Sequence, residues 1–299
     1  MNNKTEDFCF YNDTIFRIEY IGENFLDTVK SKKIYYQPIY SKIPESKVAF
    51  TKKVAYEISQ NDSIINLIDH YNGVLLDFSY KKTSAQENVR FNIRCPHKAH
   101  ENETIKKTVQ DIGFGFSWDT VQRINNGMIE YQSQRFDALH IIGFSFNNKA
   151  ITSIKYYFSL FDEAIIPDYN SFEKHHKDDL NYFYKIMDLL NINEKTVLSL
   201  KNIFDIMNSH SSYIDFIGVD FNTNGNKKYK IYYKANKNFE FINDLTNIIN
   251  SKHKVNNDVN NRIKKYRENK EKIDYFAVAF SEDTILQYQF YLMGGEEIA

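Results

Sequence analysis

The segment Gly218-Val219-Asp220-Phe221, followed by Tyr229-Lys230-Ile231-Tyr232, decides how this 299-residue chain folds. Ten residues separate Asp220 from Lys230, and the same pattern at the same spacing occurs twice more without a gap. The other copies run from Gly143-Phe144-Ser145-Phe146 to Ile154-Lys155-Tyr156-Tyr157 and from Ala277-Val278-Ala279-Phe280 to Tyr288-Gln289-Phe290-Tyr291. A pattern repeated at fixed spacing indicates one supersecondary unit that is used several times.

Each copy has the signature of a β-hairpin. Two runs of β-branched and aromatic residues flank a polar turn such as Asn222-Thr223-Asn224-Gly225-Asn226, as expected of two antiparallel strands joined by a short connection. A fourth copy has a longer turn, between Leu76-Asp77-Phe78 and Val89-Arg90-Phe91-Asn92. A fifth and weaker candidate pairs Ile15–Tyr20 with Lys33-Ile34-Tyr35.

Apolar stripes at helical spacing separate the hairpins. They comprise Ile64, Leu67 and Ile68; Ile105, Val109 and Ile112; Leu180, Phe183, Met187 and Leu190; Val197, Leu200, Phe204 and Met207; and Leu245, Ile248 and Ile249. We expect the last helix to continue through the charged stretch 262–272. The hairpins therefore recur at roughly 60 to 75 residues, each unit holding two strands and one or two helices.

A repeat of this kind predicts one α+β domain over residues 1–299, with 1–50 as an atypical N-terminal repeat and 294–299 as a short tail. About ten antiparallel strands ringed by helices would close into a barrel and leave no open edge. Side chains can just fill an eight-stranded barrel, so a ten-stranded barrel is expected to hold a cavity. An open antiparallel sheet with helices on one face is the alternative.

Composition narrows the class of protein. The formal net charge of −1 gives no electrostatic reason to expect a nucleic-acid partner. No stretch approaches the length of apolar sequence that spans a membrane, and residues 1–7 lack the apolar core of a secretory signal. Two cysteines, Cys9 and Cys95, are too few for a disulfide framework or a cysteine zinc site. We therefore expect a cytoplasmic protein without a metal site of its own.

Alternation along the strands places polar residues on one face of each second strand. These residues are Arg90 and Asn92; Lys155, Tyr157 and Ser159; Lys230, Tyr232 and Lys234; and Gln289 and Tyr291. The opposite face, with Phe91, Tyr156 and Ile231, is apolar enough to pack on helices. In the first strands, Asp77 and Asp220 share the polar face, while the neighbouring phenylalanines share the helix-packed face.

Cations and tyrosines on one lumenal face match the chemistry of a prenyl diphosphate. Arg and Lys donors stabilise the diphosphate as the C–O bond breaks, and aromatic faces stabilise the departing allylic cation. A single Lys-x-Tyr pair on a solvent-facing strand is common and carries no meaning. Copies in matched register are a stronger signal, although duplication of a structural unit also produces them.

The repeated pattern resembles the ABBA (αββα-barrel) aromatic prenyltransferases. The likeness rests on Gly143-Phe144-Ser145-Phe146 with Lys155-Tyr156-Tyr157, on Gly218-Val219-Asp220-Phe221 with Lys230-Ile231-Tyr232, and on Phe280 with Gln289-Phe290-Tyr291. It implies a cytoplasmic enzyme of secondary metabolism that moves a dimethylallyl or geranyl group from its diphosphate to a phenol, an indole or a peptide Tyr or Trp. It also implies that the diphosphate is bound by Arg90, Lys155, Lys230 and Gln289. The residues that shield the carbocation would be Tyr157, Tyr232 and Tyr291. A non-enzymatic barrel that binds a hydrophobic or aromatic ligand is the alternative.

Prenylation of an aromatic ring also needs a base. Asp77 and Asp220 are the lumenal candidates, and Glu19 and Glu57 are alternatives near the N-terminus. Asp220 has two further interpretations: it binds Mg²⁺ beside the diphosphate, or it pairs with Lys230, which is slightly favoured. No cofactor is expected to be required.

Overall fold

The computed structural model describes residues 16–24, 32–82, 87–94, 102–132, 138–159, 180–235, 241–252 and 273–293, together with residues 261, 264 and 268. Its strands are β1 (Phe16–Asn24), β2 (Lys32–Pro38), β3 (Val74–Lys82), β4 (Glu87–Arg94), β5 (Leu139–Asn147), β6 (Ala150–Ser159), β7 (Tyr213–Asn222), β8 (Lys227–Lys234), β9 (Ile273–Phe280) and β10 (Ile285–Met293). Its α-helices are α1 (Lys47–Ser59), α2 (Asp62–Tyr71), α3 (Asn102–Asp111), α4 (Trp118–Gln132), α6 (Leu180–Leu190), α7 (Glu194–Ser209) and α8 (Phe241–Lys252).

All of these strands pair antiparallel with their neighbours along the chain. β1 also pairs with β10, so the strand order β1-β10-β9-β8-β7-β6-β5-β4-β3-β2 closes on itself as a barrel. The predicted antiparallel sheet of hairpins is confirmed, and so are the helices between them. Each described strand therefore has a paired neighbour on both sides, although β2 and β3 pair only at Tyr35 with Ser79 and at Tyr36 with Phe78.

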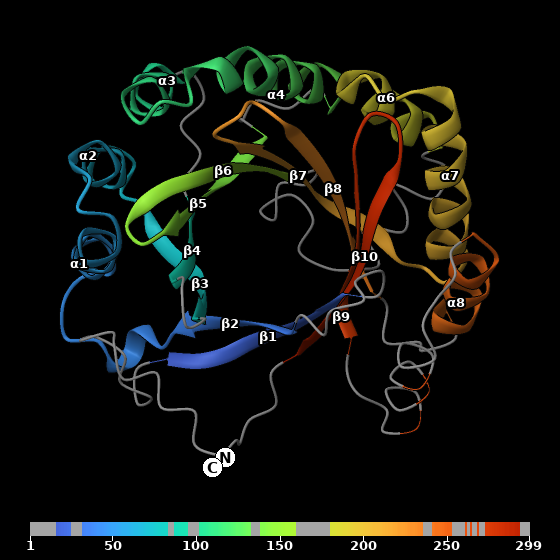
Figure 1. Cartoon of the computed structure of the whole chain (residues 1–299), viewed down its shortest axis with the longest axis horizontal. Coiled ribbons are helices and arrows are strands. Elements are labelled where there is room, and N and C mark those ends of the chain that lie inside the picture. The colour runs from blue at the N-terminus through green and yellow to red at the C-terminus, as the bar shows by residue number, and fades with distance from the viewer. Residues whose placement is uncertain are drawn as a thin grey trace.

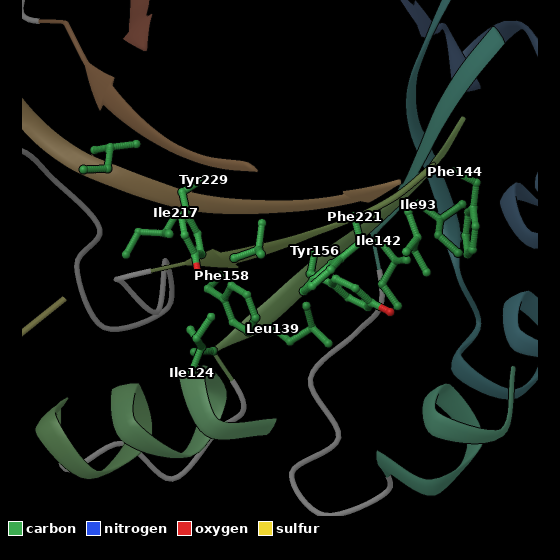
Figure 2. Packing of buried hydrophobic residues seen from close by; sticks show 14 of the residues in the cluster. Ile93, Ile124, Leu139, Ile142, Phe144, Tyr156, Phe158, Ile217, Phe221 and Tyr229 are labelled. Carbon is green, nitrogen blue, oxygen red and sulfur yellow. The ribbon is translucent and has the colours of Figure 1, made fainter. Parts of the chain in front are cut away.

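The helices form an outer layer, and the strands form the inner one. Figure 1 shows α1 to α8 following one another in an arc outside the sheet. Figure 2 shows the contact between the layers, where Ile124 of α4 faces Leu139, Tyr156 and Phe158 of the sheet. The helix-packed face predicted for the first strands is confirmed, because its four phenylalanines, Phe78, Phe146, Phe221 and Phe280, are buried in this core.

Side-chain caps fix where several helices begin. Asn61 and Asn193 accept hydrogen bonds from backbone amides in the first turns of α2 and α7, and Ser46 does the same for α1. Such caps satisfy amides that have no partner inside the helix. The apolar stripes predicted on α2, α3, α6, α7 and α8 are all present, whereas α1 and α4 were not predicted. α8 ends at Lys252, short of the charged stretch 262–272, of which only residues 264 and 268 are described, both as helix.

The weak N-terminal candidate is a real hairpin, formed by β1 and β2. A register shift between Ile18 and Tyr20 interrupts its ladder, which explains why the alternation along β1 was poor. Phe16 packs edge-on against Phe78, with ring centroids 4.9 Å apart, and so joins the same core. Ile15, both cysteines and the predicted tail 294–299 lie outside the described residues. No helix in the described part of the chain is long and apolar enough to cross a membrane.

Candidate active site

The predicted lumenal side chains come together inside the barrel. Lys155, Lys230 and Gln289 are all less than 10% exposed, although each projects from the face of its strand that is turned away from the helices. Their strands are β6, β8 and β10, and in the sheet β7 lies between the first two and β9 between the last two. Repetition of the hairpin therefore gathers these polar groups at one level of the lumen.

Arg90 and Asp220 form an ion pair across the lumen. Arg90 Nη2 donates to Asp220 Oδ2 at 2.9 Å, and Arg90 Nε donates to Ser145 Oγ at 2.6 Å. The slightly favoured prediction that Asp220 pairs with Lys230 is wrong. Its partner is the guanidinium of β4, which reaches over Ser145 and Ser153 because both are short.

The charge state of Asp220 follows from these neighbours. Burial by itself raises the pKa of its carboxyl, but the positive charges of Arg90 and Lys155 outweigh that effect, and the pKa is lowered. A carboxylate with a lowered pKa is a poor proton acceptor near neutral pH. Asp220 is therefore better suited to hold charge than to remove a proton.

Lysines and tyrosines alternate around the next part of the wall. Lys155 Nζ donates to the Tyr232 hydroxyl at 2.6 Å and lies 4.7 Å from the ring centre of Tyr157. Lys230 Nζ donates to the Tyr291 hydroxyl at 2.7 Å and also to Gln289 Oε1. The rings of Tyr157, Tyr232 and Tyr291 follow one another at centroid distances of 5.8 Å. The three predicted shield tyrosines are thus neighbours in one aromatic wall.

Burial keeps these tyrosines protonated. It raises the pKa of the Tyr157, Tyr232 and Tyr291 phenols well above their usual value, and it raises the pKa of Tyr35 to about 12. A neutral phenol presents an electron-rich ring without a strong oxygen nucleophile. Such a wall can stabilise a cation through its ring faces without being alkylated readily.

Two glycines make room for the lumenal side chains. A Cβ on Gly218 would lie 2.5 Å from Lys155 Cε, and a Cβ on Gly143 would lie 2.2 Å from Asn92 Oδ1. Both distances are shorter than any real contact. The glycines that open two copies of the repeat are therefore needed because side chains from neighbouring strands fold across them.

We expect Gly218→Ala to weaken anion binding in the lumen. The added methyl group displaces Lys155 and crowds Tyr232 Cε2, which would lie 3.3 Å away, so affinity for inorganic pyrophosphate should fall about tenfold. Titration calorimetry measures the affinity for pyrophosphate. Gly113→Ala is the control, because no atom lies within 4 Å of the Cβ that this substitution adds. Gly113 has a positive φ, so this control also reports general strain. Unchanged pyrophosphate affinity in Gly218→Ala would place the anion site elsewhere.

A cavity of about 190 Å³ lies beside the tyrosine wall. Its lining is Tyr35, Leu76, Asp77, Asn92, Arg94, Ile141, Tyr157, Phe216, Tyr232, Tyr275 and Tyr291. Asp77 is buried and accepts a hydrogen bond from Asn92 Nδ2 at 2.8 Å. The two candidate bases are thus separated, since Asp77 lines the cavity and Asp220 lies among the cations.

The sequence pattern missed several residues of this site. Tyr35 was obscured by the irregular first hairpin, and Phe216 and Tyr275 by bulges that interrupt the alternation in β7 and near the start of β9. Lys228 could have been predicted, because it lies two residues before Lys230 on the same face of β8. It donates a hydrogen bond to Gln287 Oε1 at 3.1 Å. Arg94 follows Asn92 on β4 in the same way.

Within the described residues, no three His, Cys, Asp or Glu side chains are arranged to hold a metal ion. Glu57 is on α1, in the outer layer, and is not part of the cavity lining. The side chain of Glu19 is not among the described ones.

The αββα-barrel architecture expected from the resemblance is also found in solved structures of other proteins. One solved structure with the same fold is 5-dimethylallyltryptophan synthase from Streptomyces coelicolor, with 10% sequence identity and a TM-score of 0.57 over 95% of this chain and 83% of that chain. Another match is AnaPT from Neosartorya fischeri, with 11% identity and a TM-score of 0.49 over 94% of this chain and 80% of that chain. No family model matches the sequence, and no curated protein matches it. The likeness is one of fold, and the function rests on the site.

Proposed function

We propose that this protein is an aromatic prenyltransferase that moves an allylic group from a prenyl diphosphate to an aromatic acceptor. The observation that carries the proposal is the juxtaposition of buried cations with a wall of neutral tyrosines. Lys155 and Lys230 each hydrogen-bond a tyrosine hydroxyl at 2.6–2.7 Å. A barrel that only bound an apolar ligand would have no use for buried cations, which are costly to desolvate.

In the proposed reaction, the cation group binds the diphosphate. Arg90, Lys155 and Lys230 neutralise the negative charge that develops as the allylic C–O bond breaks. The allylic cation then lies against Tyr157, Tyr232 and Tyr291, whose faces stabilise it by about 0.5–2 kcal/mol each when water is excluded. The electron pair of the aromatic acceptor forms the new C–C bond, and pyrophosphate leaves.

We propose Asp77 as the group that takes the proton released from the acceptor. It lines the cavity, whereas Asp220 is engaged by Arg90 at 2.9 Å. We also propose that the diphosphate binds without Mg²⁺, because the carboxylate nearest the cation group is already paired.

Titration with dimethylallyl S-thiolodiphosphate, a donor analogue that does not react, tests the donor site. We expect Lys155→Met and Lys230→Met to weaken binding at least tenfold, because each removes a charged donor and retains the apolar volume. Lys234→Met is the matched control, since Lys234 lies on the same face of β8 beyond Tyr232 and pairs with Asp274 at 2.6 Å. Repeating the titrations in EDTA tests the role of Mg²⁺.

Equal affinity in all three variants would remove the lysines from the donor site. If neither this analogue nor its geranyl counterpart binds to the folded protein, the non-enzymatic ligand-binding barrel becomes the better interpretation.

A further inference from the structure

Two tyrosines of the wall turn their hydroxyl oxygens toward the lysines of the proposed diphosphate site. Lys155 Nζ donates to the Tyr232 hydroxyl at 2.6 Å, and Lys230 Nζ donates to the Tyr291 hydroxyl at 2.7 Å. When a diphosphate is bound to these lysines, both oxygens lie close to the allylic C–O bond that breaks. A phenol oxygen is a nucleophile, so the wall that stabilises the allylic cation is also exposed to alkylation by it.

We infer that Lys155 and Lys230 have a second role, which is to protect Tyr232 and Tyr291 from O-alkylation. The inference rests on the proposed function, because the electrophile is the allylic cation of that reaction. In the unwanted step, the phenol oxygen bonds to the allylic carbon, the C–O bond to the diphosphate breaks, pyrophosphate leaves, and the phenol proton passes to solvent. The product is a tyrosine prenyl ether, so both tyrosines are latent modification sites.

The charge of each lysine opposes this step. Until the phenol proton leaves, alkylation places positive charge on an oxygen that lies 2.6–2.7 Å from an ammonium nitrogen. Both lysines are buried, and repulsion between like charges is stronger where water is excluded. The hydrogen bond also occupies a lone pair that the electrophile needs. Because an ammonium has three N–H donors, one lysine can bind a tyrosine hydroxyl and a diphosphate oxygen together.

Gln289 provides independent support, because it holds the proton of Tyr291. The Tyr291 hydroxyl donates to Gln289 Oε1 at 3.1 Å, and Lys230 donates to the same oxygen. An amide oxygen is a weak base and does not take up the phenol proton, so alkylation of Tyr291 is opposed at its lone pair and at its proton. A lysine at position 289 would offer no acceptor. The inference thus accounts for the glutamine in the third copy of the repeat, where the other two copies have lysine.

The test follows the allylic group when no acceptor is present. Each protein is incubated with a saturating concentration of dimethylallyl diphosphate, and pyrophosphate release and adducts on the protein are measured, the latter by mass spectrometry with peptide mapping. In Lys230→Met, the fraction of turnovers that ends as an adduct on Tyr291 should rise about tenfold or more, because a hydrogen bond to a charged group contributes at least that factor. Lys155→Met should show the same rise on Tyr232.

Further variants separate protection from a role in packing. Lys230→Arg keeps the charge and the donors, so Tyr291 should stay unmodified in it, although methionine resembles lysine more closely in volume. Tyr291→Phe in the Lys230→Met background should remove the adduct. Lys234→Met is the matched control, because Lys234 lies beyond the wall on β8 and pairs with Asp274 at 2.6 Å. Both tyrosines should remain unmodified in this control.

Dimethylallyl bromide gives the same comparison with an electrophile that needs no lysine to ionise, and it decides the result for a variant that releases no pyrophosphate. Release of pyrophosphate without an adduct in both lysine variants would overturn the inference and leave the proposed function intact. Equal labelling of the variants and the unmodified protein by the bromide, or no labelling, would do the same. If no folded protein binds the thiolodiphosphate or releases pyrophosphate, the proposed function fails and the inference fails with it.

Discussion

Replacing Asp77 with asparagine is expected to lower the rate of prenyl transfer by about 10²–10⁴-fold, the usual contribution of a general base. The substitution keeps the size of the side chain and its place beside Asn92, whose Nδ2 lies 2.8 Å from Asp77 Oδ1. It removes the carboxylate that we propose as the proton acceptor. Transfer from radiolabelled dimethylallyl diphosphate to an aromatic acceptor, a phenol or an indole, measured in a single turnover, gives this rate directly.

Asp215→Asn is the matched control for this experiment. Asp215 is a partly buried carboxylate on β7, and it accepts a hydrogen bond from the Tyr275 hydroxyl at 2.6 Å. We expect its rate to stay within a few-fold of the unmodified protein, and the affinity for the thiolodiphosphate to be unchanged in both variants. A normal rate in Asp77→Asn would reject this base and return attention to Asp220 or Glu19.

The repeat is the reason that much of this fold could be predicted from sequence. Equal spacing in three hairpins fixes which residues share a face, and a shift of one residue would move every side chain to the opposite face. Lys155, Lys230 and Gln289 are therefore found together as predicted. The apolar stripes likewise predicted most of the outer helices. α4 was missed, although Val121, Ile124 and Met128 carry the spacing that would have revealed it.

Contacts across the lumen could not be predicted in this way. Arg90 and Asp220 are 130 residues apart, and two strands separate β4 from β7 in the sheet. Local pattern relates each residue only to its own strand and the adjacent ones, so it pointed to a lysine as the partner of Asp220. The curvature of the sheet brings the two groups together, and the short side chains of Ser145 and Ser153 allow the guanidinium to pass.

The separation of the two aspartates gives the site its chemical order. The pKa of Asp220 is lowered by the cations around it, while Asp77 lines the cavity together with Tyr157, Tyr232 and Tyr291. A leaving diphosphate and an acceptor proton need groups of opposite character, and in the proposed reaction Arg90, Lys155 and Lys230 would serve the first and Asp77 the second. The proposed donor and acceptor sites can therefore be tested independently of each other.

A double-mutant cycle on Arg90 and Asp220 is expected to show a large coupling energy. Arg90→Met or Asp220→Asn alone leaves one charge in the lumen without its partner, which we expect to lower the free energy of unfolding by about 3 kcal/mol. The double variant removes both charges and should recover to within about 1 kcal/mol of the unmodified protein. Urea denaturation at neutral pH measures all four proteins. Additive losses would mean that the pair is not coupled in solution.

The same variants show whether the Arg90–Asp220 ion pair only stabilises the fold or also belongs to the anion-binding site. The two measurements are the pH dependence of stability and the affinity for pyrophosphate. The lowered pKa of Asp220 stabilises the folded state above the unfolded value of about 3.9, and this contribution is lost as the pH falls through the folded value. Stability of the double variant should therefore change less below about pH 4.

Asp220→Asn should also bind pyrophosphate more tightly in EDTA, because it removes a competing anion, whereas Arg90→Met should bind it more weakly. Equal pyrophosphate affinity in both single variants, together with a coupled loss of stability, would mean that Arg90 and Asp220 only stabilise the barrel. Lys155 and Lys230 would then be the donor site.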